Sequence, residues 1–140
     1  MPRIMLVGET GSGKTLLARC LVGEGFVPRR AMAVQYHGPL VIAPGEFLEN
    51  RRFYPALITT AAHCDILLFI QNATRPTCLF PPGFAALFNR TVVGVVSGTE
   101  KVTADVARAQ RFLHSAGVRH TVLWNAETGA GLEKLKAMMQ

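Results

Sequence analysis

The sequence predicts an α/β protein with a mostly parallel central sheet of about six strands, covered by helices on both faces. Strand-like and helix-like segments alternate along the 140 residues, and parallel strands need such crossovers, which are right-handed. The composition is 49% hydrophobic and only 17% charged, which is typical of strands covered on both sides. The length is that of one domain, so residues 1–140 are expected to form a single domain.

Apolar spacing and glycine turns delimit the elements of the N-terminal half. The apolar run RIMLV predicts a strand, and KTLLARCLVGEG has leucines at helical spacing followed by glycines that stop a helix. AVQYHGPLVIA contains a Gly-Pro turn signal between two strand-like runs. Asn50 is a candidate cap, although Pro55 favours a later start of the regular helix. The expected elements are a strand at 3–7, a helix from residue 14 that Gly23 and Gly25 stop, a loop at 26–32, two short strands within 33–43 and a helix at 50–63.

The C-terminal half is predicted in the same way. DILLFIQ and TVVGVVS are buried-type strands, and the proline-rich TRPTCLFPPG between them is a loop. Thr103 is expected to cap a helix that Gly117 ends. Phe80, Phe84 and Phe88 recur every four residues, which favours core packing, the alternative being an exposed patch for a protein partner. The expected elements are a strand at 65–71, a loop at 74–83, a short helix around 84–88, a strand at 91–97, a helix at 103–115, a strand at 119–124 and a helix from about 131.

Composition and charge argue against several classes of function. The net charge is +6, but the arginines occur singly or in pairs and not in a basic run interleaved with aromatics, so nucleic-acid binding is not expected. No apolar run approaches the roughly 18 residues of a membrane span, and the N-terminus lacks the pattern of a secretory signal. A cytoplasmic protein without a membrane partner is therefore expected. The three cysteines have no CxxC spacing, which favours reduced thiols over a metal site.

A glycine-rich stretch, GETGSGKT, lies between the first expected strand and the first expected helix. Its spacing satisfies the GxxxxGK[ST] pattern of a P-loop, in which backbone N–H groups cradle phosphate oxygens at the positive end of a helix. Lys14 would neutralise the β- and γ-phosphates, and Thr15 would offer its hydroxyl to Mg²⁺. The alternative is a glycine-rich turn without a ligand. The candidate phosphate-binding residues of this stretch are Gly8, Glu9, Thr10, Gly11, Ser12, Gly13, Lys14 and Thr15.

Two stretches carry a resemblance to a known family: MPRIMLVGETGSGKT at the start and PGEFLENRRFYPALITTAAHCDILLFI in the middle. Together with the order of elements, they make the chain resemble, over essentially its whole length, the EutP/PduV proteins. These are small Ras-like P-loop proteins encoded with ethanolamine- and propanediol-utilisation bacterial microcompartments. The resemblance implies a three-layer, small G-protein-like P-loop NTPase fold. It also implies ATP, GTP or a diphosphate form as ligand, and shell or lumen proteins of a microcompartment as candidate partners.

The magnesium residues of the family are missing from this chain. Where the family usually has Asp-Thr-Pro-Gly-Glu, this chain has IAPGE at 42–46, so Ile42 replaces the carboxylate that holds Mg²⁺ in P-loop proteins. Gly45 keeps the backbone N–H that can meet a γ-phosphate, and it joins the candidate phosphate-binding residues. The family also tends to have a threonine where this chain has Ala31. We therefore expect weakened Mg²⁺ binding.

The base-recognition positions depart from the family pattern as well. G proteins recognise guanine with Asn/Thr-Lys-x-Asp, whereas this chain has SGTE at 97–100, and its last base-contacting stretch is Asn-Ala where Ser-Ala is usual. A glycine has no aliphatic stem to lay along the base, although a glutamate still accepts hydrogen bonds from guanine. We therefore expect weak selectivity between guanine and other bases, much less than the about 10⁴-fold that a site built to pair a polar edge can reach. The candidate base-binding residues are Ser97, Gly98, Glu100, Asn125 and Ala126.

Taken together, the residues and the resemblance favour a nucleotide-phosphate-binding accessory protein of a bacterial microcompartment, with impaired or absent hydrolysis and no identifiable catalytic residue. One alternative is an active Mg²⁺-dependent NTPase or phosphotransferase that recruits Glu46 or Glu100 to the metal. Another is a nucleotide-independent interaction module. Glu46 and Glu49 could suggest a carboxylate pair for acid and base chemistry, but near a helix start they are equally explained by favourable interactions with the helix dipole. The four histidines have no metal-binding spacing.

Overall fold

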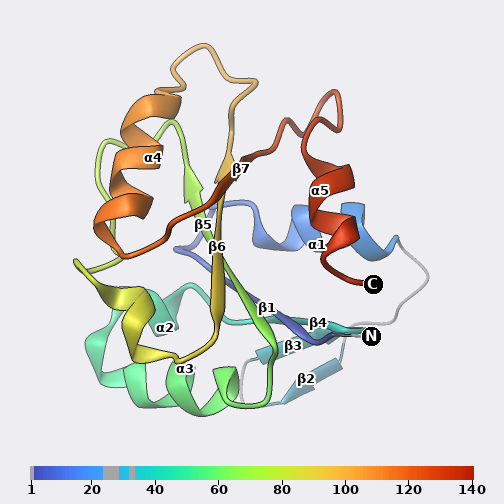
Figure 1. Ribbon diagram of the computed structural model, residues 1–140, viewed down its shortest axis with the longest axis vertical. Helices are drawn as coiled ribbons and strands as arrows, with labels where there is room; N and C mark the ends of the chain where they lie inside the picture. Colours follow the sequence, from blue (N-terminus) through green and yellow to red (C-terminus); the bar gives the residue numbers. More distant parts are fainter. Residues whose placement is uncertain (1, 24–28, 32–33) are drawn as a thin grey trace.

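The computed structural model describes residues 2–23 and 34–140 and, between them, the backbone of residues 29–31 (Figure 1). The strands are β1 (Ile4–Val7), β2 (Arg29–Ala31), β3 (Val34–His37), β4 (Leu40–Ile42), β5 (Ile66–Asn72), β6 (Thr91–Ser97) and β7 (Thr121–Leu123). The α-helices are α1 (Lys14–Val22), α2 (Glu46–Glu49), α3 (Tyr54–Ala61), α4 (Val106–Ser115) and α5 (Leu132–Ala137), and the 3-10 helices are η1 (Arg51–Phe53) and η2 (Phe84–Leu87).

The strands form one sheet in the order β2-β3-β4-β1-β5-β6-β7. β1 pairs in parallel with β4 and β5, and β5, β6 and β7 continue the parallel part. β3 is antiparallel to both β2 and β4. The predicted mostly parallel sheet with connecting helices is confirmed.

The loop predicted at 26–32 is wrong for residues 29–31, which form the edge strand β2 and pair with β3 through Arg30 and Gln35. This strand is only three residues long and has no apolar periodicity, so its partner and not its own pattern stabilises it. The rest of that loop, and the expected stop at Gly25, lie outside the described residues.

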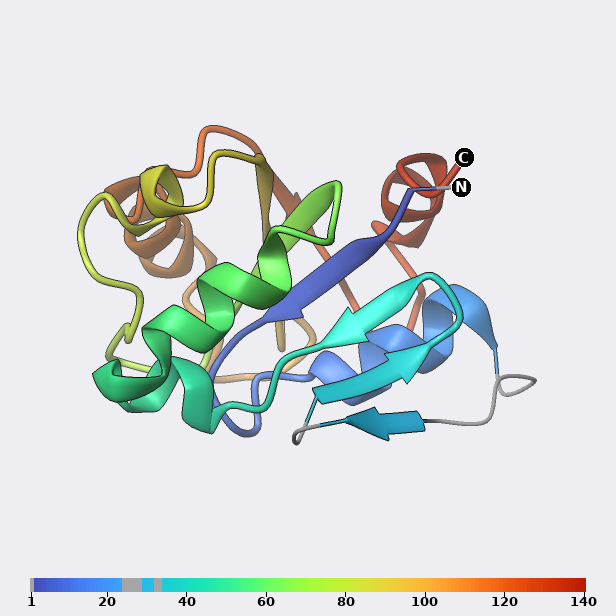
Figure 2. The same cartoon turned by 90° about the horizontal axis from the view of Figure 1, so that it is seen from below.

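Helices cover both faces of the sheet (Figures 1 and 2). α1 and α5 pack on one face, with Leu17 and Leu135 in the same apolar cluster, whereas α2, α3 and α4 pack on the other, with Leu57 and Leu113 in a second cluster. β1 shows the alternation between these faces, because Ile4 and Leu6 belong to the first cluster and Met5 and Val7 to the second. Strands buried on both sides explain the continuous apolar runs of the sequence.

The helix ends agree in part with their predicted signals. Gly23, with φ of 75°, caps the C-terminus of α1. The helix predicted at 50–63 is a 3-10 turn whose Arg52 N–H donates to the Asn50 side chain, followed by α3 with Pro55 in its first turn. The prediction that Thr103 caps α4 is wrong. The cap is Asp105, whose carboxylate accepts the Arg108 N–H at 3.0 Å. Asp is at least as good a cap as Thr.

The phenylalanine series packs in the core, as predicted. Phe80, Phe84 and Phe88 are buried, and each of them packs its ring against Phe69 on β5, with centroids between 4.6 and 5.9 Å apart. Buried aromatic pairs at these separations contribute more than their area alone. The alternative of an exposed apolar patch made by these three rings is therefore excluded.

Candidate nucleotide-binding site

The P-loop connects β1 to α1 at the carboxyl edge of the parallel strands, where ligands bind in α/β folds. Gly11 and Gly13 have φ of 82° and 104°, left-handed conformations that glycine adopts without steric cost. Gly8 is required by a close approach, because a Cβ there would lie 2.6 Å from Ser12 Oγ and 2.9 Å from the Ile70 carbonyl oxygen. The glycines thus allow the loop to curve tightly.

This curve leaves a row of backbone N–H groups without acceptors. Within the described part of the chain, the N–H groups of Gly11, Gly13, Lys14 and Thr15 donate no hydrogen bond, whereas that of Ser12 donates to the Glu9 carbonyl oxygen at 3.1 Å. Unpaired donors at the positive end of a helix are the arrangement that binds phosphate. The phosphate-binding role of residues 8–15 stays a prediction, and the geometry supports it.

The Lys14 ammonium is held inside the loop. Its side chain is 8% exposed, and Nζ donates to the carbonyl oxygens of Gly8 at 2.6 Å and Glu9 at 3.0 Å. Burial lowers the pKa of Lys14 to about 8, against the opposing effect of the Glu49 and Glu9 carboxylates. A phosphate arriving at the loop would therefore meet a preformed cation.

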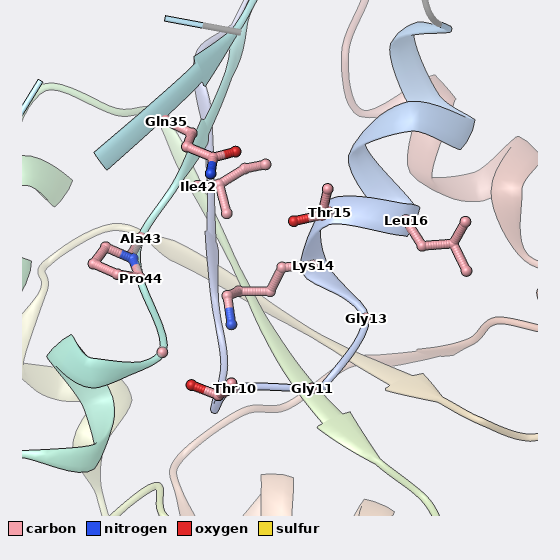
Figure 3. Close-up of a pocket in the computed structure, with 11 residues that line it drawn as sticks. Thr10, Gly11, Gly13, Lys14, Thr15, Leu16, Gln35, Ile42, Ala43 and Pro44 are labelled. Atoms are coloured by element: carbon pink, nitrogen blue, oxygen red, sulfur yellow. The ribbon is translucent and has the colours of Figure 1, made fainter. Parts of the chain in front are cut away.

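A cavity of about 530 Å³ opens beside this loop (Figure 3). Thr10, Gly11 and residues 13–16 line one side of the cavity, and Gln35 together with residues 42–45 lines the other. The two sides come from distant parts of the sequence, namely the β1–α1 connection and the β3–β4 pair with the turn that follows. Gly45 and Lys14, which were both expected at the phosphates, thus border the same space.

The residues around this cavity do not fit a magnesium ion. Thr15 supplies a hydroxyl, but the position of the family's carboxylate is taken by Ile42, which is 4% exposed and packs in the core. None of the described lining residues carries a carboxylate, whereas Mg²⁺ in proteins is usually bound through one or two of them. The described residues also contain no group of three His, Cys, Asp or Glu side chains that could hold a metal. The side chain of Ala31 lies outside the described part.

Two side chains that sequence reasoning did not place at the site hold Thr10. Its N–H donates to Glu49 Oε2 at 2.7 Å, and its carbonyl oxygen accepts a hydrogen bond from Arg75 Nη2 at 3.1 Å. Arg75 Nη1 also lies 3.1 Å from Glu9 Oε1 in an ion pair. Glu49 is 39 residues from Thr10 and Arg75 is 65 residues away, so no local pattern indicates these contacts.

The turn before α2 touches the P-loop at the same residue. A Cβ on Gly45 would lie 2.8 Å from Thr10 Cα and closer still to the Thr10 N and Oγ1 atoms. Only a glycine fits without movement of one of the two segments. The close approach places the Gly45 backbone beside the P-loop, and its contact with a γ-phosphate stays a prediction.

The candidate base-binding residues come together at the ends of β6 and β7, and several of them bond to the chain itself. Ser97 Oγ donates to the Ser12 carbonyl oxygen at 2.6 Å, and Glu100 Oε1 accepts the Ala126 N–H at 3.3 Å. Asn125 Oδ1 accepts the N–H groups of Glu127 and Thr128 in the turn that follows. These side chains therefore stabilise their loops, and their base-binding role stays a prediction.

Gly98 and Trp124 complete this side of the site. Gly98 has φ of 68° and lies against the Asn72 side chain, where a Cβ would come within 2.5 Å of Oδ1. Trp124 is 1% exposed, and its ring packs near the P-loop, since a Cβ on Gly13 would lie 3.4 Å from the ring atom Cζ3. The indole ring thus supports the loop from the β7 side of the sheet.

A model of the PduV-EutP family, described as ethanolamine utilisation and propanediol utilisation, matches residues 1–140. The chain belongs to the PduV-EutP family. It is 35% identical to the propanediol utilization protein PduV of Citrobacter freundii, over 96% of this chain and 91% of that protein. It is 34% identical to a protein of Escherichia coli named probable acetate kinase EutP, over 84% of this chain and 75% of that protein.

Solved structures show that this PduV-EutP chain has the fold of a GTPase G domain. The G domain of the T. maritima FeoB iron transporter matches with a TM-score of 0.63 at 19% identity, over 98% of this chain and 95% of that one. The translation elongation factor SelB of Methanococcus maripaludis matches with a TM-score of 0.62 at 18% identity; the match covers 99% of this chain but only 32% of SelB. Among the described residues, no helix has the length and apolar character required to cross a lipid bilayer.

The environment of Lys14 predicts a pH dependence for this PduV-EutP protein. We expect its affinity for nucleotide to fall as the pH rises through about 8, because phosphate binds the protonated ammonium and so raises the pKa of Lys14 above its value in the free protein. The affinity is complete below the free pKa and falls by up to about tenfold per pH unit above it. Calorimetric titration with ADP from neutral pH upwards would measure this, since adenine does not titrate there. An affinity that stays constant well above that pKa would contradict the prediction.

Proposed function

We propose that this chain is a nucleotide-phosphate-binding accessory protein of ethanolamine- or propanediol-type catabolism, acting in association with a bacterial microcompartment. The family supports the metabolic setting, and the G-domain fold with its P-loop supports the ligand class. The proposal includes a cytoplasmic location and protein partners in the shell or lumen, because an accessory protein without turnover would act through contacts.

One observation carries the proposal of impaired hydrolysis. The cavity presents the Lys14 ammonium and the unpaired P-loop N–H groups on one wall and the apolar Ile42 side chain on the other. A nucleoside phosphate finds donors and a cation there, but a divalent ion finds no carboxylate. Magnesium neutralises the charge that develops during phosphoryl transfer. A site that binds the phosphates without holding the metal would retain its ligand and turn it over poorly.

Isothermal titration calorimetry with GTP, GDP, ATP and ADP, each with and without Mg²⁺, tests this function. We expect binding that changes little on addition of Mg²⁺, and base selectivity of no more than about tenfold, because the polar groups of the base side bond to the chain itself. Tight Mg²⁺-dependent binding of GTP with turnover would contradict the proposal. Absence of binding, and of any shift in melting temperature at millimolar nucleotide, would favour an interaction module without nucleotide.

Replacing Ile42 with aspartate should restore a dependence on magnesium. The new carboxylate would line the cavity that Thr15 also lines, so nucleotide affinity in the presence of Mg²⁺ is expected to rise by about tenfold or more relative to affinity without the ion. The variant should also be less stable without ligand, since a buried position then holds a charge.

The Ile42→Asn variant is the matched control for this experiment, because asparagine has the shape of aspartate without its charge. It should bind nucleotide with the magnesium independence of the unmodified protein. Equal magnesium responses in the two variants would show that the defect lies elsewhere. Circular dichroism of both variants establishes that they are folded before they are titrated.

Phosphoryl transfer is the second candidate function, because a 34% identical relative carries the name probable acetate kinase. For this chain, that activity would move the terminal phosphoryl group of ATP to an acetate oxygen and release ADP. The carboxylates expected to assist are not at the cavity wall: Glu46 is exposed on α2, and Glu100 accepts the Ala126 N–H. Acetyl phosphate formed by the unmodified protein and not by Lys14→Ala would establish this activity. Absence of product at high protein concentration would exclude it.

A further inference from the structure

The Glu49 carboxylate binds the P-loop at Thr10, where the loop faces the turn before α2. Its Oε2 accepts the Thr10 N–H at 2.7 Å, and Gly45 of the same turn lies against Thr10. The hydrogen bond from the Thr10 backbone is the largest cause that lowers the pKa of Glu49, and the Lys14 and Arg75 cations lower it further. The side chain is therefore an anion throughout the physiological range, bonded to one of the backbone donors of the P-loop.

The third phosphate of a nucleotide would have to approach this anion. In a P-loop, the N–H groups at the start of the helix cradle the α- and β-phosphates, and the lysine reaches the β- and γ-phosphates. Beyond Lys14, the cavity is bounded by Thr10 and Gly45, and the Thr10 N–H carries the Glu49 carboxylate. A diphosphate bound in this way would end before this corner, whereas the γ-phosphate of a triphosphate would extend into it.

The charges around Thr10 leave no surplus cation for a further anion. Among the described residues, Lys14 and Arg75 face Thr10 from the positive side, and Glu9 and Glu49 face it from the negative side. The negative charges of Glu9 and Glu49 already stabilise the Lys14 ammonium electrostatically, and Arg75 forms an ion pair with Glu9. A diphosphate can use the unpaired N–H groups of residues 11 and 13–15, but a γ-phosphate adds negative charge where the positive charge is already matched.

We propose that Glu49 is a specificity-determining residue that makes this P-loop select nucleoside diphosphates over triphosphates. The inference rests on the proposed nucleotide binding and adds the phosphate number to it. A triphosphate binds only when Glu49 leaves Thr10, so the cost of breaking that contact and of bringing two anions together falls on triphosphates alone. Glu49 also lies in the first turn of α2, where a carboxylate interacts favourably with the helix dipole. That interaction alone does not explain why its side chain bonds to the Thr10 N–H.

The Glu49→Gln variant separates charge from hydrogen bonding, because glutamine keeps an oxygen that accepts the Thr10 N–H. Calorimetry compares ADP with the hydrolysis-resistant analogue AMPPNP, and GDP with GMPPNP, without added metal. We expect the unmodified protein to bind the diphosphates at least about tenfold more tightly, and the variant to reduce that ratio by about fivefold or more, mainly through tighter triphosphate binding. Glu46→Gln on the same short helix is the matched control, since Glu46 is exposed and its side chain forms no hydrogen bond within the described residues.

The outcomes separate this inference from the function on which it rests. Binding of neither diphosphate by the unmodified protein overturns the proposed function and the inference with it. Diphosphate binding with a ratio that Glu49→Gln leaves unchanged, or that Glu46→Gln changes equally, overturns the inference alone. If the variant does not fold, hydrogen exchange of the Thr10 amide in the unmodified protein decides: we expect protection with ADP and its loss with AMPPNP, and equal protection with both would overturn the inference.

Discussion

Replacing Lys14 with alanine is expected to weaken nucleotide binding by at least about 100-fold. The substitution removes the ammonium that would pair with a phosphate of the nucleotide, and truncating one partner of a buried, hydrogen-bonded charge pair costs several kcal/mol. Lys14 is the only cation among the described residues that line the cavity. Its ammonium sits over the Gly8 and Glu9 carbonyl oxygens, at the mouth of the curve formed by the unpaired N–H groups. Calorimetric titration of the variant with ADP and GDP measures the loss.

The stability of the same variant provides an internal check. Burial lowers the pKa of Lys14 from 10.5 to about 8, which corresponds to a burial cost of about 3 kcal/mol for the protonated form. Removing the ammonium relieves this cost but also removes its hydrogen bonds to the Gly8 and Glu9 carbonyl oxygens, so the stability of the ligand-free variant should change much less than its affinity. Lys134→Ala, at an exposed position of α5, should leave binding unchanged. Full affinity in Lys14→Ala would show that nucleotide binds elsewhere.

Replacing Gly45 with alanine is expected to lower the free energy of unfolding by about 2 to 4 kcal/mol, because overpacking forces backbone to move. The added Cβ would overlap the backbone N and Oγ1 of Thr10 and lie 2.8 Å from its Cα. Relief requires the turn before α2 to move away from the P-loop, so the contact between Glu49 and Thr10 should be lost as well. Urea unfolding followed by circular dichroism measures the change in stability.

Gly83→Ala is a useful comparison for this substitution. Gly83 is in the left-handed region, with φ of 72° and ψ of 11°, and nothing lies within 4 Å of a Cβ built there, so its replacement adds only the strain of a left-handed backbone, about 1 to 2 kcal/mol. Gly45 has an ordinary helical φ of −56°, so its replacement adds only steric overlap. A cost for Gly45→Ala no greater than that for Gly83→Ala would mean that the turn and the P-loop separate easily.

Much of the fold was predictable because its signals are local. Strands buried on both faces give continuous apolar runs, as at β1, β5 and β6. A helix buried on one face gives leucines at helical spacing, as in α1, and both patterns can be recognised in the sequence. The edge strand β2 was missed because its three residues are stabilised by pairing with β3. The cap of α4 was misplaced by two residues because Thr103 and Asp105 are both acceptable caps, and only the bond to the Arg108 N–H decides between them.

The candidate site was predictable only where its residues are consecutive. The motif located the P-loop, and Ile42 was recognised as a missing carboxylate because the family pattern spans five adjacent positions. The carboxylate on Thr10 and the arginine beside it come from segments that the sheet topology brings together. The sequence suggested only a helix-dipole role or an acid–base pair with Glu46 for Glu49, since the direction of its side chain depends on the approach of Gly45 to the P-loop.

The position of Trp124 has a practical consequence. It is the single tryptophan of the chain, and its buried ring lies beside Gly13 of the P-loop. Intrinsic fluorescence excited selectively at the indole therefore reports on one place in the molecule, next to where the nucleotide is proposed to bind. Stopped-flow mixing could follow loading and release in real time with unlabelled protein, and each variant that retains this ring can be compared on the same optical scale.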